Sequence, residues 1–149
     1  MQADWGIVGL GNPLAGDDGV GCWLAEQLRK TFPGQWIHDL GADLLKIQAL
    51  QPYPKQLILL DALCSGAKPG SLCHLSEEKL LQSPTTAAAH GFGLKGTLGL
   101  LRKTDDAFCQ IKREWWLIEV EQIHQPFVLS PAVQAGAEQL FEQLTKQLQ

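Results

Sequence analysis

The sequence lacks the paired cysteines of a zinc site or a disulfide framework. Its four cysteines, Cys22, Cys64, Cys73 and Cys109, are widely and irregularly spaced, and no two of them form a C-x-x-C pair. We therefore expect four buried, reduced thiols. Cys64 lies three residues after Asp61, but the sequence places no base beside it, so a nucleophilic thiol is not favoured.

An excess of basic residues and a long apolar run are also missing. Twelve basic residues stand against 16 acidic ones, and the net charge of -4 argues against nucleic acid or an anionic membrane surface as a partner. The amino terminus has no basic segment, and the first apolar run, residues 5–10, is short and interrupted by glycine. This pattern suits neither a signal peptide nor a membrane-spanning helix, and we expect a cytoplasmic monomer.

The remaining composition is that of one globular domain. With 149 residues, 45% of them hydrophobic, the chain is long enough to bury a core, and we expect a single domain over residues 1–149. Apolar runs alternate with amphipathic stretches, which predicts an α/β three-layer sandwich. Its sheet is expected to be twisted, mostly parallel and of about five strands, with helices on both faces.

The expected elements follow from apolar periodicity and from turn and cap residues. Strands are expected at residues 5–9, 36–38, 56–60, 71–75 and 115–120. Helices are expected at residues 17–32 and 43–50, after Ser76, around Leu94, Leu98 and Leu101, and from Ser130 and Pro131 onward, with Ser130 as the cap.

Asp61 directly follows the strand with the clearest signal. Residues 57–60 are all apolar, which is typical of a central strand covered by helices on both faces. Open α/β sheets bind ligands outside the carboxyl ends of their strands, so a functional role for Asp61 is favoured. If the strands at 5–9 and 56–60 are parallel, Asp18 and Asp61 lie at the same edge.

A glycine-rich segment, residues 9–21, joins the first strand to the first helix. A dinucleotide loop would need glycine where Leu14 stands, no P-loop lysine follows, and the carboxylates of Asp17 and Asp18 would repel a pyrophosphate. Either aspartate could simply cap a helix. The same position favours the ionised form of Asp18, which would make it available as a ligand or base.

His90 is the histidine whose setting suggests a role. Small residues surround it in the segment Ala-Ala-Ala-His-Gly-Phe-Gly, and together with Asp18 and Asp61 it would complete an oxygen, oxygen, nitrogen set suited to a borderline divalent metal. With only three protein ligands, such a site would bind metal weakly. His38, His74 and His124 are interpreted as structural or surface residues.

These residues together resemble the hydrogenase maturation endopeptidases, over nearly the whole chain. The resemblance is carried by Gly9-x-Gly11-Asn12, by Gly16-Asp17-Asp18-Gly19-x-Gly21, by Leu59-Leu60-Asp61-Ala62 and by His90. It implies an α/β sandwich in which Asp18, Asp61 and His90 contact nickel and are catalytic. The residues implied to shape the site are Gly9, Gly11, Asn12, Gly16, Asp17 and Gly19.

The resemblance also implies an unusual substrate. Enzymes of this family remove a carboxy-terminal peptide from the large-subunit precursor of a [NiFe]-hydrogenase after nickel insertion. The nickel is carried by the substrate, no tightly bound resident metal is expected, and the absence of an H-E-x-x-H motif fits this. Nickel could polarise the scissile carbonyl or activate a water, or a carboxylate could act as general base.

One segment departs from the family pattern. Residues 38–44 replace an Asp-Gly-Gly-Thr segment and are similar to the corresponding segment of proteases that serve bidirectional, NAD-linked hydrogenases; they place Asp39 and Asp43 as possible cleft residues. Two other functions stay open: a non-catalytic nickel-sensing chaperone with the same three ligands, and a nucleotide-binding domain that uses the glycine loop.

Overall fold

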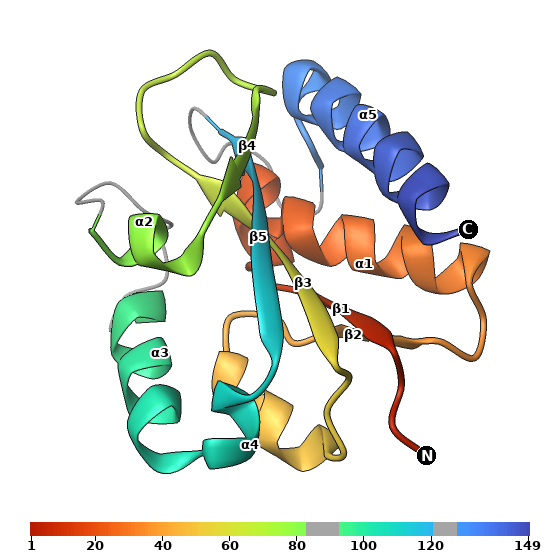
Figure 1. Ribbon diagram of the computed structural model, residues 1–149. Helices are drawn as coiled ribbons and strands as arrows, with labels where there is room; N and C mark the ends of the chain where they lie inside the picture. The colour runs from red at the N-terminus through yellow and green to blue at the C-terminus, as the bar shows by residue number, and fades with distance from the viewer. Residues whose placement is uncertain (83–92, 121–127) are drawn as a thin grey trace.

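The computed structural model describes residues 1–82, 93–120 and 128–149. Within these residues five strands form a sheet in the order β2-β1-β3-β5-β4 (Figure 1). The strands are β1 (Trp5–Gly9), β2 (Trp36–Asp39), β3 (Gln56–Leu63), β4 (Leu72–Leu75) and β5 (Lys112–Glu119). All neighbours pair in parallel except β4, which is antiparallel to β5. The predicted α/β class with a mostly parallel sheet of about five strands is confirmed.

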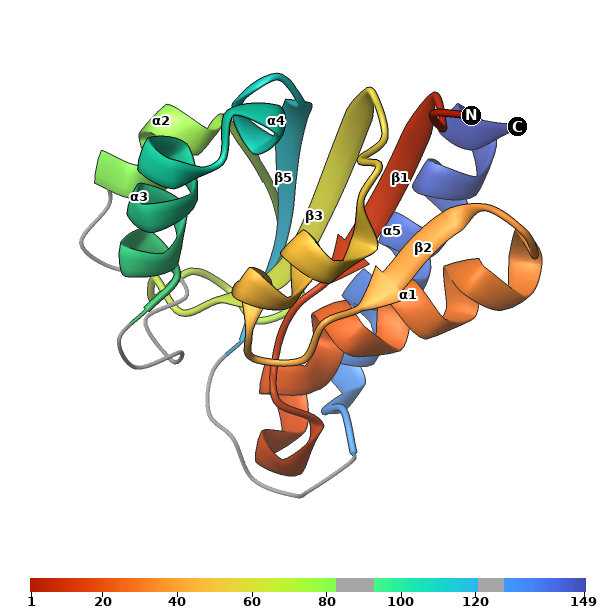
Figure 2. The ribbon, with the colours of Figure 1, turned by 90° about the horizontal axis from the view of Figure 1, so that it is seen from below.

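Helices cover both faces of the sheet, as Figure 2 shows. The helical elements are η1 (Pro13–Gly19), α1 (Val20–Thr31), η2 (Leu44–Leu50), α2 (Glu77–Gln82), α3 (Gly93–Thr104), α4 (Asp106–Cys109) and α5 (Pro131–Leu148), where η denotes a 3₁₀ helix. Helices α1 and α5 lie on one face, and α2, α3 and α4 lie on the other. No helix in these described ranges is long and apolar enough to cross a bilayer.

Strand β3 separates two apolar cores. Leu57 and Leu59 belong to the core beneath α2 and α3, whereas Ile58 and Leu60 belong to the core shared with α1 and α5. All four side chains are at most 5% exposed. Burying a leucine or isoleucine side chain contributes about 1.5–3 kcal/mol, so both helix layers are held by this strand. The prediction of a central strand that is apolar on both faces is confirmed.

The predicted end of this strand is wrong. It was placed before Asp61, but β3 continues to Leu63 because Asp61 and the two residues after it go on pairing with β5. The backbone of Asp61 is therefore part of the sheet. Its side chain projects from within the strand, two positions before the last residue, Leu63.

The predicted start of the first helix is also wrong. It was placed at Asp17, whereas the α-helix starts at Val20. Gly16 has a φ of 60° and interrupts the helical path. Residues Pro13–Gly19, which precede the α-helix, therefore form the short 3₁₀ helix η1. The second predicted helix, residues 43–50, forms as the 3₁₀ helix η2, with Asp43 as its N-cap.

The four cysteines differ in burial, contrary to the prediction that all are buried. Cys22 is buried on α1, Cys73 is half-buried on the edge strand, and Cys64 and Cys109 are exposed. Cys64 lies just past the end of β3, and Cys109 is the last residue of the four-residue helix α4, so both lie at the ends of their elements. None of the four forms a disulfide.

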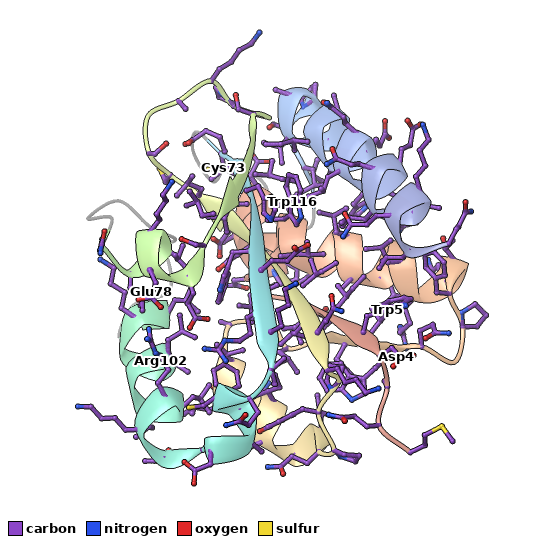
Figure 3. All side chains as sticks on the ribbon, viewed as in Figure 1. Asp4, Trp5, Cys73, Glu78, Arg102 and Trp116 are labelled. Atoms are coloured by element: carbon purple, nitrogen blue, oxygen red, sulfur yellow. The ribbon has the colours of Figure 1, made fainter. Side chains whose placement is uncertain are left out.

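A buried carboxylate joins α2 to β5. Glu77 is 7% exposed and accepts hydrogen bonds from Arg113 Nη2 at 2.6 Å and from Trp115 Nε1 at 3.1 Å. Burial alone raises the pKa of Glu77, but the hydrogen bond and charge of Arg113 outweigh it, and the pKa lies below its ordinary value. Figure 3 shows Glu78 of α2 beside Arg102 of α3, where the two side chains form a hydrogen bond of 3.3 Å. These contacts connect α2 and α3 to each other and to the sheet.

Candidate active site

The carboxyl ends of β1, β2 and β3 meet at one edge of the sheet because these strands are parallel. Gly9, the last residue of β1, pairs with Asp39 on one side and with Leu60 on the other. Asp39 and Asp61 therefore lie at this edge, and η1, which carries Asp18, follows directly from β1. The inference that Asp18 and Asp61 share an edge is borne out by the parallel pairing of β1 and β3.

The loop after β1 is joined by hydrogen bonds to β3 and to the turn that follows β2. The N–H of Leu10 donates to the carbonyl of Leu60 at 2.8 Å, and the N–H of Gly11 donates to the carbonyl of Gly41 at 2.9 Å. Gly11 has a φ of 141°, and a Cβ there would lie 2.0 Å from the carbonyl oxygen of Asp18. Only glycine allows the backbone to pass this close to Asp18.

Asn12 fixes the position of Asp18. Its side-chain oxygen accepts the N–H of Leu14 at 3.1 Å and so caps η1. Its backbone N–H donates to Oδ2 of Asp18, also at 3.1 Å. Asp18 is 2% exposed, so its carboxylate is held in a buried position by the turn that precedes it.

Asp17 joins η1 to the distant helix α5. It is 3% exposed, and its two oxygens accept the N–H of Ser130 at 2.6 Å and the hydroxyl of Ser130 at 2.8 Å. Ser130 is the N-cap of α5 by position, but its side chain makes no capping hydrogen bond to its own helix, contrary to the expected role. The reason is that its hydroxyl is used on Asp17. Asp17 thus has a structural role beside the site.

Asp61 lines a cavity of about 220 Å³. Its side chain is 1% exposed, and Oδ1 accepts the N–H of Ala62 at 2.7 Å. The walls are formed by Leu44 and Leu45 of η2 and by Leu94 and Thr97 of α3. The carboxylate therefore lies between a 3₁₀ helix on one side and the start of an α-helix on the other.

The two possible cleft residues, Asp39 and Asp43, are exposed and each stabilises a turn. Asp39 accepts the N–H of Gly41 at 2.9 Å, and Asp43 accepts the N–H of Leu45 at 3.0 Å. Asp43 lines the cavity beside Asp61, whereas Asp39 lines a different hollow next to Cys22. They belong to two separate depressions.

Cys22 shows how the acidic residues converge. Its thiol donates to the carbonyl of Gly11 at 3.5 Å. Burial raises the pKa of Cys22 most, followed by a hydrogen bond with Asp39 and by the charges of Asp39, Asp61 and Asp18. Carboxylates from three parts of the chain thus add to the effect of burial on one thiol. From the sequence Cys22 is predicted only to be an ordinary buried cysteine. The one sequence feature that relates it to the acidic residues is its position directly after Gly21, at the end of the glycine-rich segment.

His90 lies outside the described residues, as does His124. In the part of the chain that the structure covers, no three His, Cys, Asp or Glu side chains are arranged to hold a metal ion. His38 packs edge-on against Trp36, and burial together with the charge of Arg29 lowers its pKa. The ring of His74 stacks on that of Trp116, with 4.2 Å between the ring centroids.

Known proteins share both the sequence and the fold of this chain. Residues 22–147 match the family model described as hydrogenase maturation protease. Hydrogenase 3 maturation protease of Escherichia coli (strain K12) is 34% identical over 68 residues, which span 42% of this chain and 42% of that relative. The match thus covers less than half of the curated relative.

Solved structures extend the likeness to the whole chain. The [NiFe] hydrogenase maturation protease HybD from Thermococcus kodakarensis superposes with a TM-score of 0.83 at 26% identity over 100% of both chains. The hydrogenase maturating endopeptidase HybD from E. coli superposes with a TM-score of 0.72 at 26% identity, over 99% of this chain and 92% of that one. On the family match and on this structural likeness, the chain belongs to the hydrogenase maturation protease family.

Proposed function

We propose that this chain is an endopeptidase that removes the carboxy-terminal extension of a [NiFe]-hydrogenase large-subunit precursor after nickel has been inserted. The observation that carries the proposal is the convergence of Asp18 and Asp61, both nearly fully buried, at the carboxyl edge of parallel strands. Burying carboxylates is costly, and such groups beside a cavity are typical of a functional site. The relatives named above are hydrogenase maturation proteases.

In this proposal Asp18, Asp61 and His90 bind the nickel that the precursor carries. Two carboxylate oxygens and one imidazole nitrogen suit a borderline divalent ion. Structural zinc sites use four protein ligands, so a three-ligand set leaves the ion's remaining positions to the precursor. A precursor without nickel gains no such contacts, and cleavage becomes conditional on metal loading.

Binding the nickel also positions the scissile peptide bond for hydrolysis. A water oxygen adds to the carbonyl carbon, the C–N bond breaks, and the proton from the water passes to the leaving amine. Two routes fit this site: the substrate's nickel polarises the carbonyl or activates the water, or a carboxylate takes the proton from the water. Precursor loaded with a different divalent ion distinguishes them, because the rate of bond cleavage follows the ion's identity only in the first route.

Residues 38–44 support a narrower proposal about the precursor. Their similarity to proteases of NAD-linked hydrogenases suggests a bidirectional, NAD-linked hydrogenase as the source of the substrate. Within this segment Asp43 lines the cavity beside Asp61, and Asp39 lines the second hollow. Both side chains would therefore face the precursor. We further propose that the chain acts as a monomer in the cytoplasm, where the precursor is assembled.

Mass spectrometry of the precursor tests the proposal directly. The chain is mixed with nickel-loaded and with nickel-free precursor, and only the loaded precursor should lose the mass of its carboxy-terminal extension. Asp18→Ala and His90→Ala should abolish the loss. Their matched controls are Asp4→Ala, which removes an 84% exposed carboxylate paired with Lys55, and His74→Ala, which removes a half-exposed imidazole. Both controls should process the precursor like wild type.

The outcomes separate the alternatives. Unchanged processing by Asp18→Ala or His90→Ala would refute the site assignment. Nickel-dependent binding of the precursor without shortening would indicate a nickel-sensing chaperone instead of a protease. Measurable binding of NAD or ATP would favour the nucleotide-binding alternative, which the buried carboxylates of Asp17 and Asp18 in the glycine loop argue against.

A further inference from the structure

A second hollow, of about 210 Å³, lies between η1, the first turns of α1 and the segment before α5. Its walls are mainly apolar and include Pro13, Cys22, Trp23 and Leu129. Among the residues that the structure describes, none lines both this hollow and the cavity at Asp61. Pockets that hold a whole small molecule usually measure about 300–1,000 Å³, so the hollow is better matched to one side chain of a larger partner.

Two exposed apolar residues directly adjoin lining residues of this hollow in the sequence. Among the described residues the large apolar side chains that are strongly exposed are Met1, Leu14, Leu100 and Val128. Leu14 is 62% exposed and follows Pro13 in η1, and Val128 is 52% exposed and precedes Leu129. Single exposed apolar residues are common, but here two of them, from distant segments, each stand next to a residue that lines the same apolar hollow, which favours an interaction surface.

The hollow adjoins the proposed nickel-binding residues. Gly16 and Gly19 line it, and in η1 they flank the buried Asp17 and Asp18. Cys22 also lines it, and its thiol donates a hydrogen bond to the carbonyl of Gly11, in the loop whose next residue, Asn12, donates to Asp18. A partner side chain seated in the hollow would therefore hold its own backbone close to the site of cleavage.

The charges of the lining restrict the partner further. Glu26 and Asp39 are its acidic members, and no lysine or arginine is found among its described residues. Glu26 forms an ion pair of 2.7 Å with Arg29, but an exposed pair of this kind contributes little to stability. Asp39 accepts the N–H of Gly41 with Oδ1, and it lines the hollow as an exposed acidic residue. An acidic segment would be repelled, and a basic residue beside an apolar one would be attracted.

We infer that this hollow docks the hydrogenase precursor by taking one of its aliphatic side chains, with a basic residue next to it, while the precursor's nickel is bound by Asp18 and its partners. The inference rests on the proposed function and deepens it by naming the surface that recognises the substrate. Leu14 and Val128 become covered in the complex, which gives these two exposed side chains a physical role.

Charge substitutions at the rim test this docking. Leu14→Glu and Val128→Glu are each compared with Leu100→Glu, a matched control on α3, on the opposite face of the sheet (Figure 2), where the leucine is 47% exposed. The dissociation constant for nickel-loaded precursor is measured by titration calorimetry, and KM and kcat are measured by mass loss. We expect the dissociation constant and KM to rise about tenfold to a hundredfold for the rim variants and to stay unchanged for Leu100→Glu.

The results distinguish failure of the docking surface from failure of the proposed function. If wild type shortens the precursor and the rim variants bind it as tightly as wild type, the docking surface is wrong and the protease proposal stands. If wild type binds the precursor without shortening it and the rim variants lose binding, the protease proposal fails and the docking surface stands. An equal loss in Leu100→Glu, or no binding by wild type, would overturn the docking surface.

Discussion

Removing the hydroxyl of Ser130 should loosen α5 from the glycine loop. That hydroxyl donates to Oδ2 of Asp17 at 2.8 Å, and the backbone N–H of Ser130 donates to Oδ1 at 2.6 Å. A hydrogen bond to a charged group contributes about 1.5–3 kcal/mol. Ser130→Ala removes one of the two bonds, and because Ser130 is only half-buried we expect a loss of about 1.5–2 kcal/mol in the free energy of unfolding. Asp17→Ala removes both bonds, and we expect a loss of about 2–4 kcal/mol.

Urea unfolding followed by circular dichroism measures this loss. With a urea m-value of about 1–3 kcal/mol per molar, Ser130→Ala should lower the midpoint by about 0.5–2 M. The matched control is Ser71→Ala, which removes an exposed serine hydroxyl that donates to the carbonyl of Lys68 at 2.6 Å. Because that serine is exposed and its acceptor is neutral, the control should stay within about 0.5 kcal/mol of wild type.

A double-mutant cycle decides whether the two residues act together. If Asp17 holds α5 through Ser130, the loss in the double variant should be smaller than the sum of the two single losses. Additive losses, or an unchanged midpoint for Ser130→Ala, would refute the claim that this pair anchors η1. Asp18 follows Asp17 directly, so we also expect the single variants to process precursor more slowly under conditions in which they remain folded.

Three further predictions concern charge, thiol reactivity and backbone. Because the fold lowers the pKa of Glu77, its stabilising contribution is complete above the ordinary value of 4.5 and is lost as pH falls through the folded pKa. The difference in unfolding free energy between wild type and Glu77→Gln should thus shrink below about pH 4.5, and a constant difference from pH 7 to 3 would contradict this. Iodoacetamide should label the exposed Cys64 in the native chain but Cys22 only in urea, because burial raises the pKa of Cys22; native labelling of Cys22 would show an open site. Gly11→Ala should abolish precursor processing, since a Cβ would lie 2.0 Å from a carbonyl oxygen, whereas Gly34→Ala, with φ also positive but open space around it, should process normally and cost about 1 kcal/mol.

The sequence predicted the order of the strands and helices well because their signals are local. Apolar residues on both faces identified β3, and the alternation of strands and amphipathic stretches indicated a parallel sheet. Three predicted boundaries are wrong: the end of β3, the start of α1, and the start of β5, which begins at Lys112 and not at residue 115. The first two have causes that lie outside those patterns. Gly16 adopts a positive φ that its sequence neighbours do not specify, and β3 is lengthened by residues of β5 that are more than fifty positions away.

The position of Asp18 and Asp61 in the site was predictable from the fold class. Parallel pairing of β1 and β3 follows from fold class, and it is sufficient to bring Asp18 and Asp61 to one edge. The use of Asp17 was not predictable, because its partner Ser130 is 113 positions away and had a plausible local role as a helix cap. The hollow beside Leu14 was missed because it is made by segments that meet only in the folded chain.

The protonation of Cys22 bears on why the proposed site would bind nickel weakly. A thiolate among Asp18, Asp39 and Asp61 would add a fourth negative charge and a soft ligand that holds borderline metals tightly. Burial and the three carboxylates instead raise the pKa of Cys22, so at neutral pH the thiol remains protonated and donates to the carbonyl of Gly11. In the metal-free chain, burial and the charges of these carboxylates therefore keep the nearby sulfur a neutral thiol. Under the proposed function, weak binding would let a metal delivered by the substrate leave with the product.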